Sequence, residues 1–300
     1  MSIEVTVGVC LRNCEKDVID IIDRILAQDY PHENMEVLFV EEGSVDNTLS
    51  RLVEIAPKMD INHKIFHHEW KGLGFSRNFI SKNARGNYIL WIDDGTFIPS
   101  NYIEKQVDFM ETRPDVGIAT GLIKFMSGLN WVATLENIGE VVYSQRNDEE
   151  STTRMPAAGG SIYRVKAIQE VGGFDENIKG ATEDTDIAYR IMLAGWKISI
   201  SKITYSRDFN NEFRKIWNRS IWYGYGAHYL LQKHKELRFM LYKSVPLAGL
   251  LEGLLISIPA YRLTNKKLAF LLPIYTFIKR LAWSIGYAKS HADSYGHFKL

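Results

Sequence analysis

Apolar residues in the first 120 positions alternate between short continuous runs and runs with helical spacing. Three largely apolar or β-branched runs have the length of buried strands, residues 3–10, 35–40 and 88–92, and residues 61–67 are a further candidate strand. Residues 18–26 have helical spacing, and cap and stop signals predict further helices over residues 46–56 and 74–84 and from Ser100 to before Pro114. Strands that alternate regularly with helices indicate an α/β fold, in which a mostly parallel sheet carries helices on both faces.

Beyond residue 120 the pattern is less regular. Residues 184–194 predict one more helix, and after about residue 207 the chain changes to aromatic helices. The two most apolar stretches, residues 245–261 and 268–288, lie in this tail. We therefore predict an α/β domain over residues 1–207 and a helical C-terminal region over residues 208–300.

The composition excludes a disordered, collagenous or coiled-coil protein, because 46% of the 300 residues are hydrophobic and 24% are charged. The net charge is zero, but its distribution is uneven. Residues 1–200 carry 20 Lys and Arg against 31 Asp and Glu, whereas residues 201–300 carry 16 against 5. A basic, aromatic tail with apolar runs favours a membrane surface as its partner, and we expect no nucleic-acid partner.

The two cysteines, Cys10 and Cys14, cannot build a disulfide framework, which indicates a reducing compartment. Neither is proposed as a nucleophile. The N-terminal segment lacks a basic region followed by a long apolar core, so no signal peptide is predicted. The eight histidines have no spacing typical of metal ligands.

Charged residues interrupt both apolar stretches of the tail, Glu252 the first and Lys279-Arg280 the second. A membrane span needs about 20 largely uncharged residues, so each stretch is marginal. Two spans would also place Arg262 and the Lys266-Lys267 pair on the far side of the membrane from the cytoplasm, against the positive-inside tendency. We therefore expect helices that lie in or dip into the interface; the alternative is a buried helical subdomain of a soluble protein.

Acidic residues cluster at three places along the chain. Glu41-Glu42 follows the second predicted strand, Asp93-Asp94 follows the fourth, and Glu183-Asp184 with Asp186 begins a helix. Each cluster by itself is explained by helix capping or a solvated turn. Together they bring six or more carboxylates to one edge of the sheet, where mutual repulsion would be relieved by a cation or by sugar hydroxyls.

An ordered set of motifs resembles the family 2 glycosyltransferases. The segments are VEEGSVDNT at residues 40–48, Lys71-Gly72 with Arg77-Asn78, ILWIDDGTFIPSNYIE at residues 89–104, the glycine-rich segments at 158–161 and 171–176, and TEDTDIAYRIMLAGWK at residues 182–197. Thr182-Glu183-Asp184 is identical to the TED box of processive members. The resemblance covers residues 3–230 and implies the GT-A fold, an α/β fold that binds nucleotide-diphospho-sugars, over the 1–207 domain.

For the donor, a sugar bound to a nucleoside diphosphate, the resemblance implies a role for each of several residues. Glu41 and Glu42 match carboxylates that contact the nucleoside. Asp93 matches the first Asp of the Asp-x-Asp motif, which orients ribose, a metal ion or both. The leaving diphosphate would be stabilised by metal, Lys71 or Arg77.

For catalysis, Asp184 matches the base that takes the acceptor hydroxyl proton, which implies a single displacement with inversion. Gly160, in the acceptor-side segment, and Glu183, in the TED box, are also expected to bind substrate. Arg219 loosely resembles the arginine of the Gln-x-x-Arg-Trp box, which holds diphosphate and acceptor sugar. An amphipathic interface helix explains the aromatic residues around Arg219 equally well.

The sequence departs from the family pattern where a metal ion is expected to bind. Mn²⁺ or Mg²⁺ is expected at Asp93 and Asp94, but Gly95 stands at the third position of Asp-x-Asp. Either Asp94 replaces the missing carboxylate or metal binding is weak. Residues 202–209 contain no His, although many members place a late metal ligand there. Metal dependence is therefore open.

The resemblance implies an inverting glycosyltransferase at the cytoplasmic face of the cell membrane, with a nucleotide-sugar donor and a lipid-linked or glycan acceptor. The alternative from another class is a non-catalytic subunit that binds sugar nucleotides or glycans, which Gly95 favours and the TED box opposes. A nucleotidyltransferase would need a Gly-rich basic loop after the first strand, and residues 11–14 do not supply one.

Overall fold

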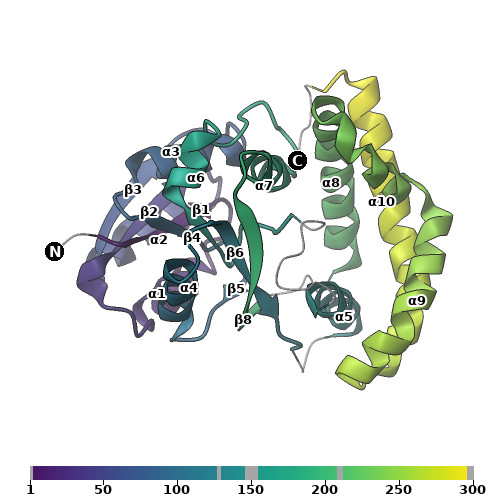
Figure 1. Cartoon of the computed structure of the whole chain (residues 1–300), viewed down its shortest axis with the longest axis horizontal. Helices are drawn as coiled ribbons and strands as arrows, with labels where there is room; N and C mark the ends of the chain where they lie inside the picture. Colours follow the sequence, from purple (N-terminus) through teal and green to yellow (C-terminus); the bar gives the residue numbers. More distant parts are fainter. Residues whose placement is uncertain (1–2, 127–129, 146–154, 208–211, 296–300) are drawn as a thin grey trace. The chain divides into compact units, whose positions relative to one another are not determined.

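The computed structural model describes residues 3–126, 130–145, 155–207 and 212–295 (Figure 1). Contacts between residues divide the chain into two compact units. The first unit comprises residues 1–122, 147–177 and 184–208, and the second comprises residues 123–146, 178–183 and 209–300. The first unit is an α/β sheet structure and the second is helical.

One sheet organises the first unit. Its strands are β1 (Val5–Leu11), β2 (Met35–Glu41), β3 (Asn62–His67), β4 (Tyr88–Trp91), β5 (Thr96–Phe97), β6 (Val116–Ile123), β7 (Ser161–Arg164) and β8 (Lys197–Arg207). The strand order is β3-β2-β1-β4-β7-β6-β8-β5. Strands β1 to β4 are parallel, whereas β7 runs antiparallel to both β4 and β6, and β5 pairs antiparallel with β8. The four predicted strands and the mostly parallel sheet are confirmed.

Helices connect the strands of the first unit. They are α1 (Val18–Leu26), α2 (Thr48–Ile55), α3 (Leu73–Asn83), α4 (Tyr102–Glu111), α6 (Val165–Glu170) and α7 (Glu183–Leu193), with short 3-10 turns at His32–Asn34 and Ala56–Lys58. In Figure 1, α1 and α4 lie on the opposite side of the sheet from α3, α6 and α7. The prediction of an α/β sheet covered on both faces is therefore confirmed.

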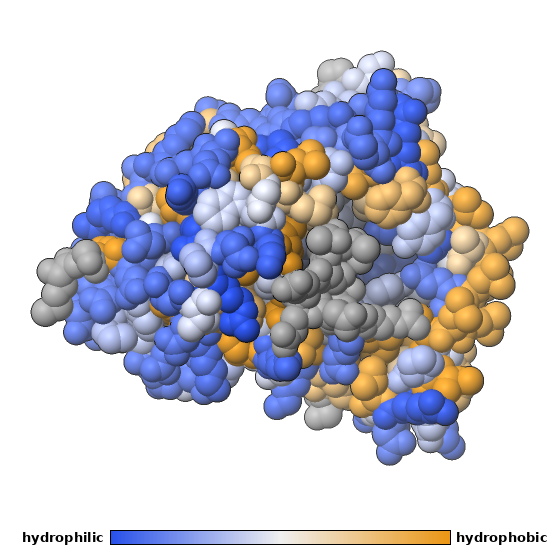
Figure 2. All heavy atoms as spheres, viewed as in Figure 1, coloured by the Kyte–Doolittle hydropathy of each residue, from blue (hydrophilic) through white to orange (hydrophobic). Residues whose placement is uncertain are grey.

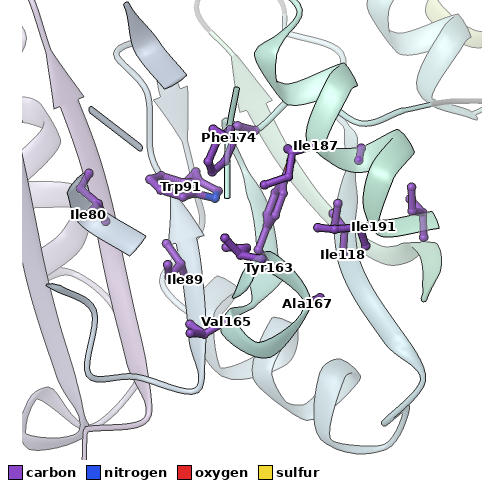
Figure 3. Packing of buried hydrophobic residues seen from close by; sticks show 14 of the residues in the cluster. Ile80, Ile89, Trp91, Ile118, Tyr163, Val165, Ala167, Phe174, Ile187 and Ile191 are labelled. Carbon is purple, nitrogen blue, oxygen red and sulfur yellow. The ribbon is translucent and has the colours of Figure 1, made fainter. Parts of the chain in front are cut away.

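The hydrophobic core at the end of β4 is built around Trp91, the last residue of that strand (Figure 3). Its ring makes edge contacts with Tyr163 of β7 and with Phe174, at centroid distances of 6.3 and 5.7 Å. Gly8 leaves the space for this ring, because a Cβ at that position would lie 2.7 Å from Trp91. Close packing here fixes the end of β4, and with it the residues that follow.

The helical unit consists of α5 (Trp131–Gln145), α8 (Phe213–Lys233), α9 (Pro246–Thr264), α10 (Leu272–Ala292) and the 3-10 segments Lys235–Ser244 and Lys267–Leu271. Helix α10 packs against both α8 and α9. A Cβ at Gly249 would lie 2.9 Å from the Thr276 carbonyl oxygen, so glycine permits the close approach of α9 and α10. Glu252 of α9 is ion-paired with Arg280 of α10, which neutralises two charges that interrupt the apolar stretches.

Two segments of the helical unit are long and apolar enough to cross a membrane, by length and composition only: Pro246–Thr264 and Lys267–Ala292. Core helices of soluble proteins meet the same criteria, so this finding fixes no topology. Exposed apolar side chains follow one face of α9, at Leu247, Leu251, Leu254, Leu255 and Ile258. Figure 2 shows apolar surface gathered over this helix.

Candidate active site

The loop after β2 is organised around the carboxylate of Glu41. Glu41 is fully buried and accepts hydrogen bonds from the Ser44 and Gly43 amides, at 2.7 and 3.3 Å. His67, its neighbour across the β2–β3 pairing, lies 2.6 Å from the same carboxylate. Burial would raise the pKa of Glu41, but these hydrogen bonds outweigh it and hold the pKa below its usual value. Glu41 is therefore an ionised group that shapes its own loop.

Glu42 lies in a different environment from its neighbour. Its side chain is buried, and the Oε1 atom has no hydrogen-bond partner within the described part of the chain. Burial raises the pKa of Glu42 to about 7, although a hydrogen bond from Ser76 and the nearby charges of Arg77 and Arg12 lower it in part. A buried carboxylate oxygen without a partner is a candidate acceptor for a ligand hydroxyl or N–H group.

Arg77 and Asp93 connect α3 to the end of β4. The Arg77 Nη2 atom lies 3.2 Å from Asp93 Oδ1, and the arginine side chain is only 3% exposed. The guanidinium also lies 5.7 and 5.9 Å from the ring centroids of Trp91 and Phe174. A buried arginine thus fixes a carboxylate that is itself 35% exposed and accessible to a ligand.

The residues around this pair are more exposed. Asp94 is exposed, and Gly95 adopts φ +68° in the turn that leads into β5. Lys71 is exposed, with its ammonium 4.6 Å from the ring centroid of Phe75. Within the residues that the structure describes, no group of three or more His, Cys, Asp or Glu side chains could hold a metal ion.

A glycine turn before β7 forms the floor of the site. The Gly160 N–H donates to the Trp91 carbonyl at 2.8 Å, and the residue adopts φ +82° against the ring of Tyr205. A Cβ at Gly159 would lie 2.6 Å from Asp93 Oδ2 and 3.1 Å from Arg207 Nη2. Both glycines are therefore required by close approach, and Asp93 and Arg207 converge on Gly159.

Asp184, in the first turn of α7, is held beside the same turn. Its Oδ2 accepts from the Ala158 N–H at 3.3 Å and its Oδ1 from the Thr185 N–H at 2.7 Å. The side chain is partly exposed, whereas the preceding Glu183 is buried. Asp184 thus contacts Ala158, and the next residue along the chain, Gly159, is the contact point of Asp93.

Arg219 belongs to the helical unit and is ion-paired there with Glu136 of α5. Glu136 is 1% exposed, and Lys279 of α10 lies 3.9 Å from the same carboxylate oxygen. The structure therefore brings Glu42, Arg77, Asp93 and Asp184 to one edge of the sheet unit, whereas Arg219 has a carboxylate partner within the helices.

Sequence reasoning missed two residues of this edge. His67 contacts Glu41 because β3 pairs with β2, a register that no local pattern specifies. Arg207 ends β8 and pairs with Thr96 of β5, immediately after the Asp93-Asp94-Gly95 turn. The available signal for Arg207 was that residues 202–209 contain a cationic side chain and no His.

Comparisons with known proteins give one family and several relatives. A model of the family described as glycosyl transferase family 2 matches residues 6–172. The chain is 27% identical over 195 residues to an uncharacterized glycosyltransferase of Rickettsia conorii. This match covers 64% of this chain and 31% of that protein. The chain is 23% identical over 239 residues to a poly-beta-1,6-N-acetyl-D-glucosamine synthase of Staphylococcus aureus, covering 76% of this chain and 57% of the synthase. The chain thus spans less than two thirds of these curated relatives.

Solved structures share the fold. The mannosyltransferase PcManGT of Pyrobaculum calidifontis, in complex with GDP-Man and Mn²⁺, matches with a TM-score of 0.71 at 17% identity, over 98% of this chain and 88% of that one. Residues 1–349 of Staphylococcus aureus TarS, in complex with UDP, match with a TM-score of 0.55 at 17% identity, over 97% and 92%. At this identity the likeness establishes the GT-A fold alone.

Proposed function

Because this chain belongs to glycosyl transferase family 2, we propose that it transfers a sugar from a nucleoside diphosphate donor to an acceptor hydroxyl. The observation that supports this best is the grouping of Arg77, Asp93 and Asp184 around the Gly159 turn. Glycosyl transfer needs a cation for the diphosphate, a carboxylate for sugar or ribose hydroxyls, and a base for the acceptor. This edge offers all three.

In the proposed donor site, Glu41 and Glu42 have different tasks. Glu41 is already satisfied by its loop and by His67, so it fixes the loop that receives the nucleoside. Glu42 offers a carboxylate oxygen that has no partner among the described residues, which suits a direct contact with the nucleoside. Lys71 and Arg77 supply positive charge for the diphosphate.

In the proposed reaction, Asp184 takes the proton from the acceptor hydroxyl while that oxygen attacks the anomeric carbon. The bond from this carbon to the diphosphate oxygen breaks, and the nucleoside diphosphate leaves with the electron pair. Hydrogen bonds from Ala158 and Thr185 hold the carboxylate, and its partial exposure leaves it accessible to an acceptor. A single displacement inverts the anomeric configuration. Gly160 and Glu183 are proposed to border the acceptor.

The proposed acceptor is a growing saccharide or a lipid-linked sugar, because one matched relative is a synthase of poly-beta-1,6-N-acetyl-D-glucosamine. We further propose that the helical region after residue 207 lies on a membrane surface. The exposed apolar face of α9 supports this, since five Leu and Ile side chains on one face would be buried in acyl chains. Arg262, Lys266 and Lys267 follow at the end of α9 and would bind anionic headgroups.

Metal binding at Asp93 and Asp94 has support from the Mn²⁺ of the mannosyltransferase structure. The donor set in this chain fits it poorly. Asp93 is engaged by Arg77, Gly95 supplies no carboxylate, and no three-ligand group occurs among the described residues. The proposed mechanism therefore assigns no step to a metal ion.

Asp184→Asn tests the proposed base. We expect turnover, measured as release of nucleoside diphosphate from UDP-, GDP-, CDP- and TDP-sugars with a saccharide acceptor mixture, to fall roughly 100- to 10,000-fold. Nucleotide affinity should be unchanged. Asp115→Asn is the matched control, because Asp115 is an exposed carboxylate, ion-paired with Lys197, just before β6.

Four outcomes distinguish the proposed function from its alternatives. Loss of turnover with intact nucleotide binding supports the base, and near-wild-type turnover in Asp184→Asn rejects it. A wild-type protein that binds a nucleoside diphosphate but never turns over would favour a non-catalytic subunit. A folded wild-type protein that binds none of the four nucleotides would reject the proposed function altogether.

A further inference from the structure

An arginine lies beside the turn after β4, in the segment where the resemblance to family 2 implies a late metal ligand. Strand β8 ends at Arg207, and the β5–β8 register pairs this residue with Thr96. Thr96 follows Asp93, Asp94 and Gly95 directly in the sequence. Antiparallel pairing therefore fixes the end of β8 beside the acidic turn.

The geometry places the Arg207 guanidinium near the carboxylate of Asp93. Arg207 Nη2 donates to the Gly159 carbonyl oxygen at 3.0 Å. The same nitrogen and Asp93 Oδ2 both lie within about 3 Å of the point that a Cβ of Gly159 would occupy, at 3.1 and 2.6 Å. Asp93 Oδ1 lies 3.2 Å from Arg77 Nη2. One partly exposed carboxylate is thus flanked by two guanidinium groups.

This arrangement disagrees with a divalent metal at Asp93. Mg²⁺ and Mn²⁺ prefer several oxygen ligands, and here the second carboxylate of the motif is replaced by Gly95. An arginine stays protonated at any working pH and has no lone pair to offer a metal. Two fixed positive charges around one carboxylate also repel a further dication.

The same arrangement suits a diphosphate. A guanidinium presents a rigid fork of N–H donors that matches two phosphate oxygens, and its bonds to phosphate are charge-assisted. Arg77 is buried and Arg207 is hydrogen-bonded to the backbone of the glycine turn, so both are held before any ligand arrives. Preorganised cations lose little freedom on binding.

We propose that Arg207, together with Arg77, holds the donor diphosphate in place of a divalent metal, so that donor binding needs no metal ion. This inference rests on the proposed glycosyltransferase function. In it, Asp93 orients both guanidinium groups, in addition to the contact with sugar or ribose hydroxyls proposed above. Arg207 donates N–H groups to the diphosphate and stabilises the charge that develops on the leaving group.

The experiment is calorimetric titration of the full chain with UDP, GDP, CDP and TDP, in EDTA and then in Mn²⁺ or Mg²⁺. We expect one of these nucleotides to bind with the same affinity, within threefold, in EDTA and in metal. Arg207→Gln should weaken that binding about tenfold to hundredfold, because charge-assisted hydrogen bonds are lost. Arg207→Lys keeps the charge without the fork and should give an intermediate loss.

Arg113→Gln is the matched control, because Arg113 is exposed and stacks on Phe109, near the start of β6. The Arg113→Gln variant should bind the nucleotide with the same affinity as the wild type. Binding that disappears in EDTA and returns with Mn²⁺ would overturn the inference and leave the proposed function intact. Metal-free binding that Arg207→Gln leaves unchanged would overturn the role of Arg207. Absence of binding under every condition, in a folded protein, would instead reject the proposed function.

Discussion

Two different roles have been assigned to Arg219 above, and Arg219→Gln distinguishes them. The resemblance to the Gln-x-x-Arg-Trp box implies that Arg219 is a ligand of the diphosphate. The structure pairs it with Glu136, a carboxylate that is 1% exposed inside the helical unit. If the ion pair is the main role, the substitution destabilises the helices and leaves nucleotide affinity intact.

The expected loss in the free energy of unfolding depends on the charge that Arg219→Gln leaves unpaired, which is that of Glu136. Removing one partner of a buried ion pair costs about 3–5 kcal/mol, because the other charge remains in a poorly solvated site. Two features reduce this cost. The Arg219 side chain is 36% exposed, so water screens part of the pair, and Lys279 lies 3.9 Å from the same Glu136 oxygen. We therefore expect a loss of about 2–3 kcal/mol.

The assay is thermal unfolding of the full chain, combined with hydrogen exchange of α5 and α8. A loss of this size should lower the thermal midpoint by roughly 4–12 °C. Exchange should accelerate in α5, since Glu136 lies within that helix. Arg214→Gln is the matched control, because Arg214 is an exposed arginine one turn earlier on α8, and its midpoint should stay at the wild-type value.

A double-mutant cycle that combines Arg219→Gln with Glu136→Gln tests the structural role of Arg219. Glu136→Gln alone should cost about 1 kcal/mol, since it removes the buried charge itself and leaves an arginine that water can reach. The double variant should then be more stable than the sum of the two single effects by at least about 1 kcal/mol. Additive effects within about 0.5 kcal/mol, or a loss of UDP and GDP affinity in Arg219→Gln without loss of stability, would refute the structural role.

Two further predictions concern pH and membrane binding. Because the pKa of Glu42 is raised to about 7 in the fold, the folded protein binds more protons than the unfolded chain between pH 4.5 and 7, and stability falls as the pH rises through this window. Glu42→Gln removes this loss, so urea titrations should show its stability relative to wild type rising from pH 5 to pH 8; a constant difference would contradict the raised pKa. On α9, Leu251→Glu with Leu255→Glu should reduce co-sedimentation with vesicles of phosphatidylcholine and phosphatidylglycerol at least about tenfold, because both side chains are exposed on the apolar face. Val53→Glu, at an exposed apolar position of α2, should leave sedimentation unchanged, and equal sedimentation of all three proteins would reject the membrane surface.

The parallel core of the sheet could be predicted because each of its signals is local. Strands β1, β2 and β4 are mostly apolar runs of four to seven residues, whereas β3 has only the Ile65-Phe66 pair; helices with their own periodicity separate the four strands. Parallel pairing through helical crossovers then places the ends of β2 and β4 at one edge, so the acidic residues that follow them could be grouped without a structure. The motif order added the fold and the expected chemistry.

The other half of the sheet had no such signal. Strand β5 has two residues, and β8 reaches it only by antiparallel pairing across more than 100 positions of sequence. The segment at residues 123–146 joins the helical unit although it lies in the middle of the sheet sequence. These choices depend on packing between distant parts of the chain, which no short window contains.

Residue type and spacing are sufficient to specify the alternation of strands and helices, the acidic edge, and the missing carboxylate at Gly95. Which charges meet depends on how distant segments pack in the fold. Glu252 and Arg280 interrupt two separate apolar stretches in the sequence, but they neutralise each other where α9 and α10 pack. Asp93 stands two positions before Gly95 in the sequence, but in the fold it lies between Arg77 and Arg207, which come from α3 and β8. Electrostatic interaction depends on distance in space, and only the folded backbone sets that distance.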